Sequence, residues 1–310
     1  MIRWTIAIVL TLAASGCDPA ERTSSVPLSA GKIVPVCSLQ DDRITEASGI
    51  VASQRCPGCF YVHNDSGGQP RVFLVDRTGQ TRVAAQLVPA KALDYEDIAL
   101  APGEEPGTFD VCAADIGDNL AQRPNVTIYR FREVSCPEAA GQTVSAEPVS
   151  YEARYAEGPV NAEAFVVHPL TGDGYVFTKR EDGQTTVYKL AAPWDAENEN
   201  VLTRVVTLTL PPALPLARIV TGADLAPDGR RLVLRCYVDG WEWRLPADAP
   251  ADAFDRLLAT QPVRLLLAPE RQGEAICYAA DGQSVLTVSE GEAPQLYEVS
   301  RPASASESGL

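Results

Sequence analysis

The sequence is poor in histidine: its 310 residues include only two, His63 and His168. A Ser-His-Asp triad needs imidazole, and no nucleophile elbow is present to accompany one. The chain also lacks a glycine-rich phosphate-binding loop and a basic, aromatic stripe of the kind that binds single-stranded nucleic acid. These absences argue against a serine hydrolase, a P-loop nucleotide-binding protein and a nucleic-acid-binding protein.

Positive charge is also scarce. Lys and Arg total 26 against 41 Asp and Glu, which gives a net charge of −15 at pH 7. Such a chain repels nucleic acid, and we expect no nucleic-acid partner. The acidity is explained either by solubility or by calcium binding outside the cytoplasm. The mean hydropathy of −0.06 indicates that most of the chain is not embedded in a membrane.

The first 17 residues have the pattern of an export signal. Arg3 precedes an apolar stretch over residues 4–14, which is too short to span a bilayer. The segment Ala14-Ser15-Gly16-Cys17 resembles a bacterial lipobox, although Ala14 stands where Leu is usual. We therefore predict a lipoprotein signal peptide over 1–17, with Cys17 lipidated and anchoring the protein to a membrane. The alternative is an ordinary cleaved signal that leaves an unmodified cysteine.

This signal predicts an extracytoplasmic protein, periplasmic and lipid-anchored in a bacterial cell envelope. Asp18 resembles an inner-membrane retention signal. Residues 18–32 are rich in Ser, Pro and charge, and we interpret them as a flexible tether. Residues 301–310 are expected to form a disordered tail. One domain is predicted over 33–300, and we expect it to be a monomer.

Within that domain a strand-rich unit recurs five times, at spacings of roughly 50 to 65 residues. The leading segments of the five units are Glu46-Ala47-Ser48-Gly49-Ile50, Tyr95-Glu96-Asp97-Ile98-Ala99, Asn161-Ala162-Glu163-Ala164-Phe165, Gly222-Ala223-Asp224-Leu225 and Gly273-Glu274-Ala275-Ile276. A repeat of this length built from strands is typical of a β-propeller. We predict an all-β fold, a β-propeller of five four-stranded blades, or six if two units are merged.

Only three strands are visible in the last unit, whereas residues 32–38 at the start have no unit of their own. We expect this N-terminal strand to become the fourth strand of the last blade and so close the ring. A short helix is expected near Phe254, capped by Asp248.

Seven cysteines follow the signal segment, and export permits disulfides. Cys112 and Cys136 lie on segments expected to be neighbours in one blade, and we predict that they are bonded. Cys56-Pro57-Gly58-Cys59 lies at a predicted hairpin turn. Its cysteines are interpreted as a turn-closing disulfide, as free thiols or, without a second CxxC or a His pair, as a metal site.

In a propeller, the start of each first strand and the end of each second strand gather near one mouth of the central channel. We expect this to bring together many carboxylates, which cannot all stay ionised unless cations neutralise them. Oxygen ligands with few histidines select calcium or magnesium, and calcium is the predicted cofactor. The predicted metal ligands are Asp97, Asp115, Asp118, Asn119 and Glu163. The predicted ligand-binding residues are Glu46, His63, Asn64, Asp65, Asp224 and Glu290.

Two cations, Lys179 and Arg235, are expected among these acids, where they would stabilise developing negative charge. Glu96 and Glu274 are the candidate general bases. These four residues make up the predicted catalytic set. Asp115-Ile116-Gly117-Asp118-Asn119 offers oxygen ligands on a tight turn, but its spacing is not that of an EF-hand.

Several of these segments together resemble an uncharacterised family of secreted bacterial β-propeller proteins. The segments that carry the resemblance are Glu46-Ala47-Ser48-Gly49-Ile50, Val62-His63-Asn64-Asp65-Ser66-Gly67, Asp94-Tyr95-Glu96-Asp97-Ile98-Ala99, Asp115-Ile116-Gly117-Asp118-Asn119, Asn161-Ala162-Glu163-Ala164, Thr178-Lys179 and Gln272-Gly273-Glu274-Ala275. The resemblance spans most of 40–300 and implies a fold and export, not a reaction. More distantly, the chain resembles the esterase-like phytase and the calcium-activated nucleotidase (apyrase) propellers, without the full motif set of either.

The sequence thus favours a membrane-anchored, extracytoplasmic propeller with an acidic, calcium-binding channel, acting as a module that binds a small anionic ligand or an envelope protein. The alternative is a calcium-dependent hydrolase of phosphoesters or related anionic substrates. A bound cation beside Lys and Arg would suit either ligand class.

Overall fold

The computed structural model describes residues 28–29, 31–66 and 68–300. The described chain is all-β, as predicted: its helices are α1 (Phe254–Leu258) and the 3-10 turn η1 (Pro215–Arg218). The predicted signal peptide, the lipidation at Cys17 and the predicted tail lie outside the described residues. Asp248 does not cap α1, because the helix begins at Phe254 and its N-cap Ala253 offers no side-chain bond.

The strands form four sheets. The first contains β3 (Ala47–Ala52), β4 (Cys59–Asn64), β5 (Arg71–Asp76), β6 (Thr81–Leu87) and β10 (Gln142–Ala146), in that order. The second runs β7 (Tyr95–Pro102), β8 (Phe109–Asp115), β9 (Val126–Arg132), β11 (Val149–Tyr155), β15 (Asn200–Thr209), β14 (Gln184–Leu190), β13 (Gly174–Thr178) and β12 (Ala162–Val167). The third contains β16 (Val220–Leu225), β17 (Arg231–Cys236), β18 (Asp239–Arg244), β19 (Val263–Leu266) and β1 (Leu28–Ser29), and the fourth β20 (Gly273–Tyr278), β21 (Ser284–Ser289), β22 (Gln295–Ser300) and β2 (Ile33–Ser38).

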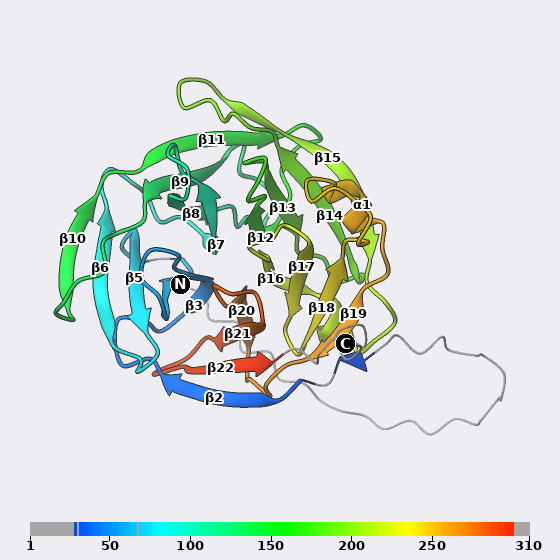
Figure 1. Ribbon diagram of the computed structural model, residues 1–310. Helices are drawn as coiled ribbons and strands as arrows, with labels where there is room; N and C mark the ends of the chain where they lie inside the picture. Colours follow the sequence, from blue (N-terminus) through cyan, green and yellow to red (C-terminus); the bar gives the residue numbers. More distant parts are fainter. Residues whose placement is uncertain (1–27, 30, 67, 301–310) are drawn as a thin grey trace.

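Five strands, β3, β7, β12, β16 and β20, lie around the centre of the molecule, and we call them the inner strands (Figure 1). Each packs against the next, and β20 packs against β3, so that the five form a closed ring. Every residue of β3, β12 and β20 is buried. Near-continuous runs of small and apolar residues in these strands fit a position covered on both faces.

Apolar side chains fill the spaces between neighbouring sheets. Phe73 of β5 and Leu286 of β21 belong to one apolar cluster, and Val72 of β5 and Val111 of β8 belong to another. Burial of a large side chain such as Phe73, which is 2% exposed, contributes about 1.5–3 kcal/mol to stability. The core is therefore distributed around the ring in the gaps between sheets.

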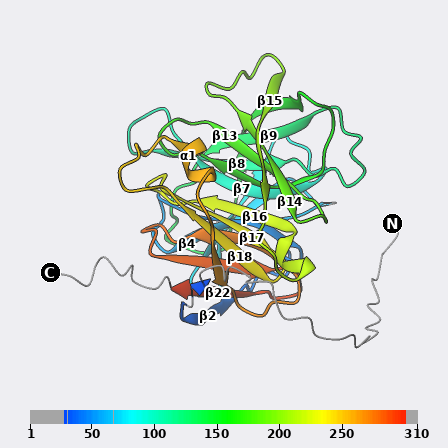
Figure 2. The ribbon, with the colours of Figure 1, turned by 90° about the vertical axis from the view of Figure 1, so that its right-hand side faces the viewer.

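The N-terminal part of the chain completes the fourth sheet. β2 pairs antiparallel with β22, with Ile33 opposite Val299, and the two strands lie side by side in both views (Figure 1, Figure 2). This is the pairing expected for residues 32–38. The predicted tether is corrected in part, because Leu28–Ser29 forms β1 and pairs parallel with Arg264–Leu265 of β19.

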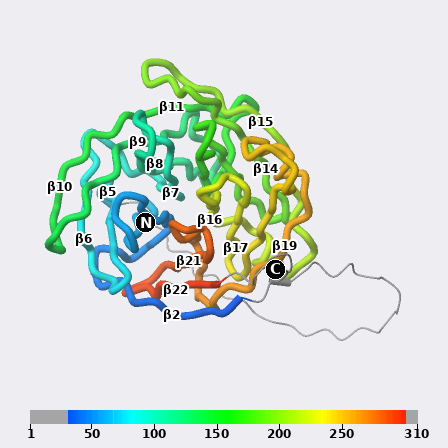
Figure 3. Tube along the Cα trace, in the orientation of Figure 1, coloured from blue at the N-terminus to red at the C-terminus, as the bar shows by residue number. Residues whose placement is uncertain are grey.

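The segment between β9 and β11 leaves its own sheet. β10 pairs parallel with β6 at the outer edge of the first sheet, before the chain returns to pair β11 with β9 (Figure 3). This excursion corrects the predicted disulfide. Cys136 follows β9 on the way to β10 and is bonded to Cys56, whereas Cys112 is a free, buried thiol in β8. The crossover carries Cys136 away from Cys112 and onto the neighbouring sheet.

Candidate functional site

All five inner strands carry the same irregularity. Near its start, each skips one residue in its pairing with the next strand, which is the signature of a β-bulge. The skipped residues are Ser48, Glu96, Glu163, Thr221 and Glu274. They occupy equivalent positions in the five units, and all five are buried.

Two of the five positions hold short hydroxyl side chains that tie neighbouring inner strands together. Ser48 Oγ donates to the Glu96 carbonyl at 2.7 Å, and Thr221 Oγ1 donates to the Gly273 carbonyl at 2.9 Å. The other three positions hold glutamates. The repeat therefore differs from the expected one, because Glu46 and Asp224 are not equivalent to Glu96, Glu163 and Glu274.

The glutamates are joined by two aspartates from neighbouring loops. Asp65 follows β4 and Asp94 precedes β7, and carboxylate oxygens of Asp65, Asp94 and Glu96 all lie within 4.8 Å of one another. Glu163 lies close enough to Glu96 to raise the pKa of its carboxyl group. We call Asp65, Asp94, Glu96, Glu163 and Glu274 the acidic cluster.

The backbone at Gly117 closes one side of the acidic cluster. A Cβ at this position would collide with Glu96 Oε1 and Asp94 Oδ2. Gly117 N also donates to the Asp94 carbonyl at 3.1 Å. The glycine in the 115–119 turn thus lets these carboxylates lie close to the backbone.

Burial changes the proton affinity of the cluster. It raises the pKa of Asp65 to about 8, and the neighbouring carboxylates of Asp94 and Glu163 act in the same direction. Burial and then Glu163, Asp65 and Asp94 raise the pKa of Glu96 well above its usual value. Burial likewise raises the pKa of Asp94. These carboxyl groups need either protons or a cation to be stable side by side.

A lysine lies against the same cluster. Lys179 Nζ is 2.9 Å from Glu163 Oε1 and 5.3 Å from the centre of the Tyr237 ring. Burial lowers the pKa of Lys179, but Glu163 and Tyr237 outweigh that effect and raise it. The ammonium group is therefore a fixed positive charge at the edge of the cluster.

Glu274 is only partly hydrogen-bonded. Gln272 Nε2 donates to its Oε1 at 3.0 Å, while its buried Oε2 has no hydrogen-bond partner among the described residues. Burial raises the pKa of Glu274 to about 7, against the lowering effect of Lys179. A buried carboxylate oxygen without a partner needs an explanation, such as a bound ion or water.

Asp97, predicted as a metal ligand, has a different environment. Its Oδ2 accepts hydrogen bonds from the backbone N–H groups of Phe165 at 2.9 Å and Ala223 at 3.1 Å. The carboxylate therefore joins β7 to β12 and β16, and it is fully buried. Its oxygens are already used in holding the ring together.

The other predicted metal ligands organise the loop beside the cluster. Asp115 accepts from the backbone N–H groups of Leu93 and Asp94 at 3.2 and 3.1 Å and forms an ion pair with Arg123 at 2.8 Å. Asp118 Oδ2 accepts from Arg123 N at 2.7 Å. Asn119 Oδ1 accepts from Asn161 Nδ2 at 3.2 Å. Of the predicted metal set, Glu163 alone belongs to the acidic cluster.

Of the predicted ligand-binding residues, Asp65 belongs to the acidic cluster and the others have different environments. Asn64 Oδ1 accepts from Thr45 N and Glu46 N and holds a loop. His63 is fully buried, and burial lowers its pKa to about 4. Glu46 is exposed, and Glu290 is half-buried with its pKa raised by burial and by Glu46.

Two predicted residues form hydrogen bonds that join the third sheet to the fourth. Asp224 Oδ2 accepts from Tyr278 N at 2.7 Å, and burial raises the pKa of Asp224 to about 7. Arg235, predicted as catalytic, is fully buried and bonds Glu270 at 2.5 Å and the Ala275 carbonyl at 3.2 Å. Its guanidinium is thus engaged by Glu270 and by the backbone next to Glu274, whereas the side chains of Glu96, Glu274 and Lys179 belong to or border the acidic cluster.

Sequence reasoning missed Asp94, Tyr237 and the role of Gly117. Asp94 precedes the bulge at Glu96 by two residues and belongs to the segment 94–99 that carries the family resemblance. The sequence therefore contained a signal for it. Tyr237 follows β17 and had no such signal, because its place beside Lys179 depends on the approach of two sheets.

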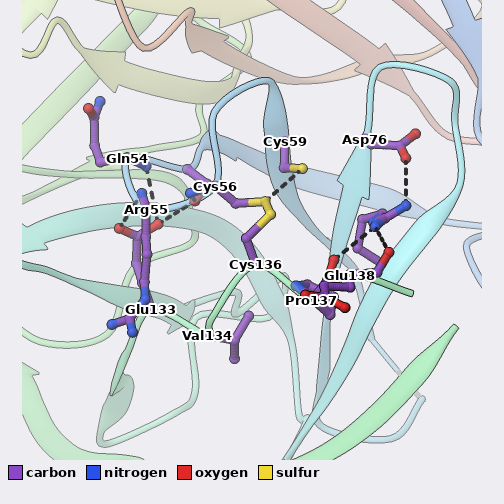
Figure 4. The surroundings of a disulfide bond; sticks show 12 residues. Gln54, Arg55, Cys56, Cys59, Asp76, Glu133, Val134, Cys136, Pro137 and Glu138 are labelled. Atoms are coloured by element: carbon purple, nitrogen blue, oxygen red, sulfur yellow. Dashed lines mark hydrogen bonds and ion pairs between the residues drawn. A yellow bond between two sulfur atoms is a disulfide. The ribbon is translucent and has the colours of Figure 1, made fainter. Parts of the chain in front are cut away.

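The three cysteines around the CxxC turn also lie together. Sulfur atoms of Cys56, Cys59 and Cys136 are within 4.8 Å of one another, and the bond between Cys56 and Cys136 leaves Cys59 as a free thiol (Figure 4). A turn-closing disulfide between Cys56 and Cys59 is therefore not observed.

No protein-family model matches this chain, and the comparison with curated proteins finds no significant match. Within the described residues, no helix has the length and apolar character needed to cross a bilayer.

Proposed function

We propose that the protein is a five-bladed β-propeller that binds calcium at the acidic cluster and, through the cation and Lys179, a small anionic ligand. The blade interpretation divides the eight-stranded sheet at the parallel pair β11–β15 and treats β1 and β10 as additions to two outer edges. Five sheets of four strands then remain. The closed ring of inner strands and the equivalent bulge in each support this division.

The observation that carries the cation site is the approach of Asp65, Asp94 and Glu96 within 4.8 Å. Glu163 is near enough to raise the pKa of Glu96. Carboxylate oxygens are the ligands that calcium prefers, and calcium tolerates irregular geometry. The unpaired, buried Oε2 of Glu274 is an independent sign that the cluster takes another group. We therefore replace the predicted ligands Asp97, Asp115, Asp118 and Asn119 by Asp65, Asp94 and Glu96.

Lys179 suits the anionic ligand. A calcium ion on the carboxylates would present open coordination positions, and the ammonium group held by Glu163 would provide a second positive charge nearby. Such a pair recognises a carboxylate or a phosphate group.

The proposed location is outside the cytoplasm, with a lipid on Cys17. The disulfide between Cys56 and Cys136 supports this location, because disulfides persist in oxidising compartments.

Calcium binding is tested by isothermal titration calorimetry on protein treated with EDTA. We expect one site with a Kd on the order of 10⁻⁴–10⁻³ M, the range of extracellular calcium modules. Asp94→Asn and Glu96→Gln should abolish binding. Asp248→Asn is the matched control, because Asp248 has an 81% exposed side chain and the substitution removes the same charge. Equal binding by Asp94→Asn and Asp248→Asn would refute the site.

The second candidate function is a calcium-dependent hydrolase of anionic esters. The observation that favours it is Glu274, whose pKa of about 7 suits proton transfer near neutral pH, beside the Lys179 charge. A panel of phosphomonoesters, nucleotides and lactones tests it. We expect any turnover to require calcium and to be lost in Glu274→Gln. Calcium binding without turnover of any substrate would support the binding function and argue against the hydrolase.

A further inference from the structure

The CxxC turn brings a free thiol against a disulfide. Cys59 Sγ lies 3.1 Å from Cys56 Sγ, which is itself bonded to Cys136 (Figure 4). Cys56 and Cys59 are buried, whereas Cys136 is exposed. The buried thiol therefore faces the sulfur of a buried cysteine, and the cysteine at the other end of the bond is an exposed residue.

We propose that Cys56, Cys59 and Cys136 form a thiol–disulfide exchange site that presents Cys136 as a reactive thiol at the protein surface. The Cys59 thiolate attacks Cys56 Sγ, the new Cys56–Cys59 bond forms, and the bond to Cys136 breaks. The electron pair leaves on Cys136 Sγ, which takes up a proton equivalent to the one that Cys59 lost. The step involves no net oxidation and needs no external reagent.

The turn geometry accommodates the second disulfide. Cys59 N donates to the Cys56 carbonyl at 3.0 Å, so residues 56–59 form a tight turn, with Pro57 and Gly58 in its centre and Gly58 at φ +76°. The Cα atoms at the ends of such a turn lie less than about 7 Å apart, which is within the span of a disulfide. The exchange requires rotation of side chains rather than movement of β4.

The Cys136 segment stays docked when its sulfur is released. Glu133 accepts hydrogen bonds from Ser53 Oγ at 2.6 Å and from the backbone N–H of Arg55 at 3.1 Å. Val134 N donates to Tyr61 Oη at 3.0 Å, and Arg82 donates to the Pro137 carbonyl at 2.8 Å. These contacts flank Cys136 on both sides, so that its thiol remains near Cys56 and the exchange is reversible.

The surroundings of Cys59 determine how the rate of exchange depends on pH. Burial raises the pKa of the Cys59 thiol, Asp76 of β5 acts in the same direction, and Arg82 of β6 opposes both. The thiolate is the attacking species, so below this pKa the exchange should accelerate about tenfold for each pH unit.

The released Cys136 would react with a low-molecular-weight disulfide. Its thiolate attacks one sulfur of that compound, a mixed disulfide forms on Cys136, and the other half leaves as a thiol. The Cys56–Cys59 bond remains and keeps the buried pair oxidised.

Alkylation with N-ethylmaleimide followed by tryptic peptide mapping without reduction tests the proposal. Cleavage after Arg55, Arg71, Arg132 and Arg154 gives peptides 56–71 and 133–154. Before exchange, the two peptides are cross-linked. After it, 56–71 carries an internal disulfide and 133–154 carries the label on Cys136. We expect the second pattern to accumulate, faster at higher pH, and oxidised glutathione to give a mixed disulfide on the same peptide.

Cys59→Ser should reduce labelling of Cys136 at least about tenfold, because the attacking thiolate is gone. Cys112→Ser is the matched control, since Cys112 is a free, buried thiol in a different apolar cluster, and it should leave the rate unchanged. Circular dichroism checks that both variants are folded. Label on Cys59 with the cross-link intact would overturn the proposal. So would labelling of Cys112 and Cys277 as fast as Cys136, because that would indicate global unfolding.

Discussion

Asp97 Oδ2 accepts the backbone N–H of Phe165 at 2.9 Å, and through this bond a side chain of β7 holds the inner strand β12. The same oxygen accepts Ala223 N of β16 at 3.1 Å. One carboxylate thus connects three of the five inner strands. Burial raises the pKa of Asp97, and the N–H donors act against that rise.

Asp97→Ala should destabilise the fold strongly. It leaves the N–H groups of Phe165 and Ala223 buried without an acceptor, at a cost of about 1–3 kcal/mol for each. Asp97→Asn retains one acceptor oxygen and should cost less. Urea unfolding at constant calcium measures the difference. A stability of Asp97→Ala equal to that of the unmodified protein would show that the bridge contributes nothing.

Asp97 illustrates which features of the fold and site can be predicted from the sequence and which cannot. The repeated leading segments predict strands that meet at a common centre, and the all-β fold and the pairing of β2 with β22 follow from them. The segments do not reveal which acids share a position, because that depends on the bulge. In the first and fourth units the bulge residues are Ser48 and Thr221, while the nearby acids Glu46 and Asp224 lie two residues before and three residues after them.

The remaining differences have a similar physical origin. Asp115 was expected to bind metal; in the structure it accepts from backbone N–H groups and pairs with Arg123, and such local bonds leave no trace in residue spacing. Cys136 was assigned to the wrong partner because the crossover through β10 carries it to another sheet. Strand periodicity predicts elements within a unit and says little about excursions between units.

Gly117→Ala should weaken calcium binding. The added Cβ would collide with Glu96 Oε1 and Asp94 Oδ2, so both carboxylates would have to move. We expect the Kd for calcium to rise about tenfold, which corresponds to a loss of about 1.4 kcal/mol. Gly68→Ala provides the control, because a Cβ there meets nothing within 4 Å and its φ is ordinary. Calorimetric titration compares the two, and equal affinities would argue against the cluster as the site.

The stability of the calcium-free protein should fall as the pH rises from about 5 to about 8. Burial raises the pKa of Asp65 to about 8 and that of Glu274 to about 7. The folded state therefore binds more protons than the unfolded state between the ordinary and the raised pKa values. Stability from these groups is present at low pH and is lost as the pH passes through 7 and 8.

Thermal unfolding in EDTA across this pH range measures the effect. Asp65→Asn should flatten the profile, because its neutral amide has no proton to lose. Saturating calcium should also flatten it, since the cation then replaces the protons. A Tm in EDTA that is constant or increasing from pH 5 to pH 8 in the unmodified protein would contradict the raised pKa values.

Lys179→Met should destabilise the calcium-free protein and strengthen calcium binding. Without calcium, Glu163 loses the ammonium group 2.9 Å away, and a buried carboxylate left without its partner costs about 1–3 kcal/mol. With calcium, the repulsion between the ammonium group and the cation is removed and Glu163 is released as a ligand. We therefore expect a lower Tm in EDTA together with tighter calcium binding. Lys189→Met is the matched control, because Lys189 forms a similar ion pair with Asp173 at 2.8 Å outside the acidic cluster. It should leave the Kd unchanged, and weaker calcium binding in Lys179→Met would place the cation away from Glu163.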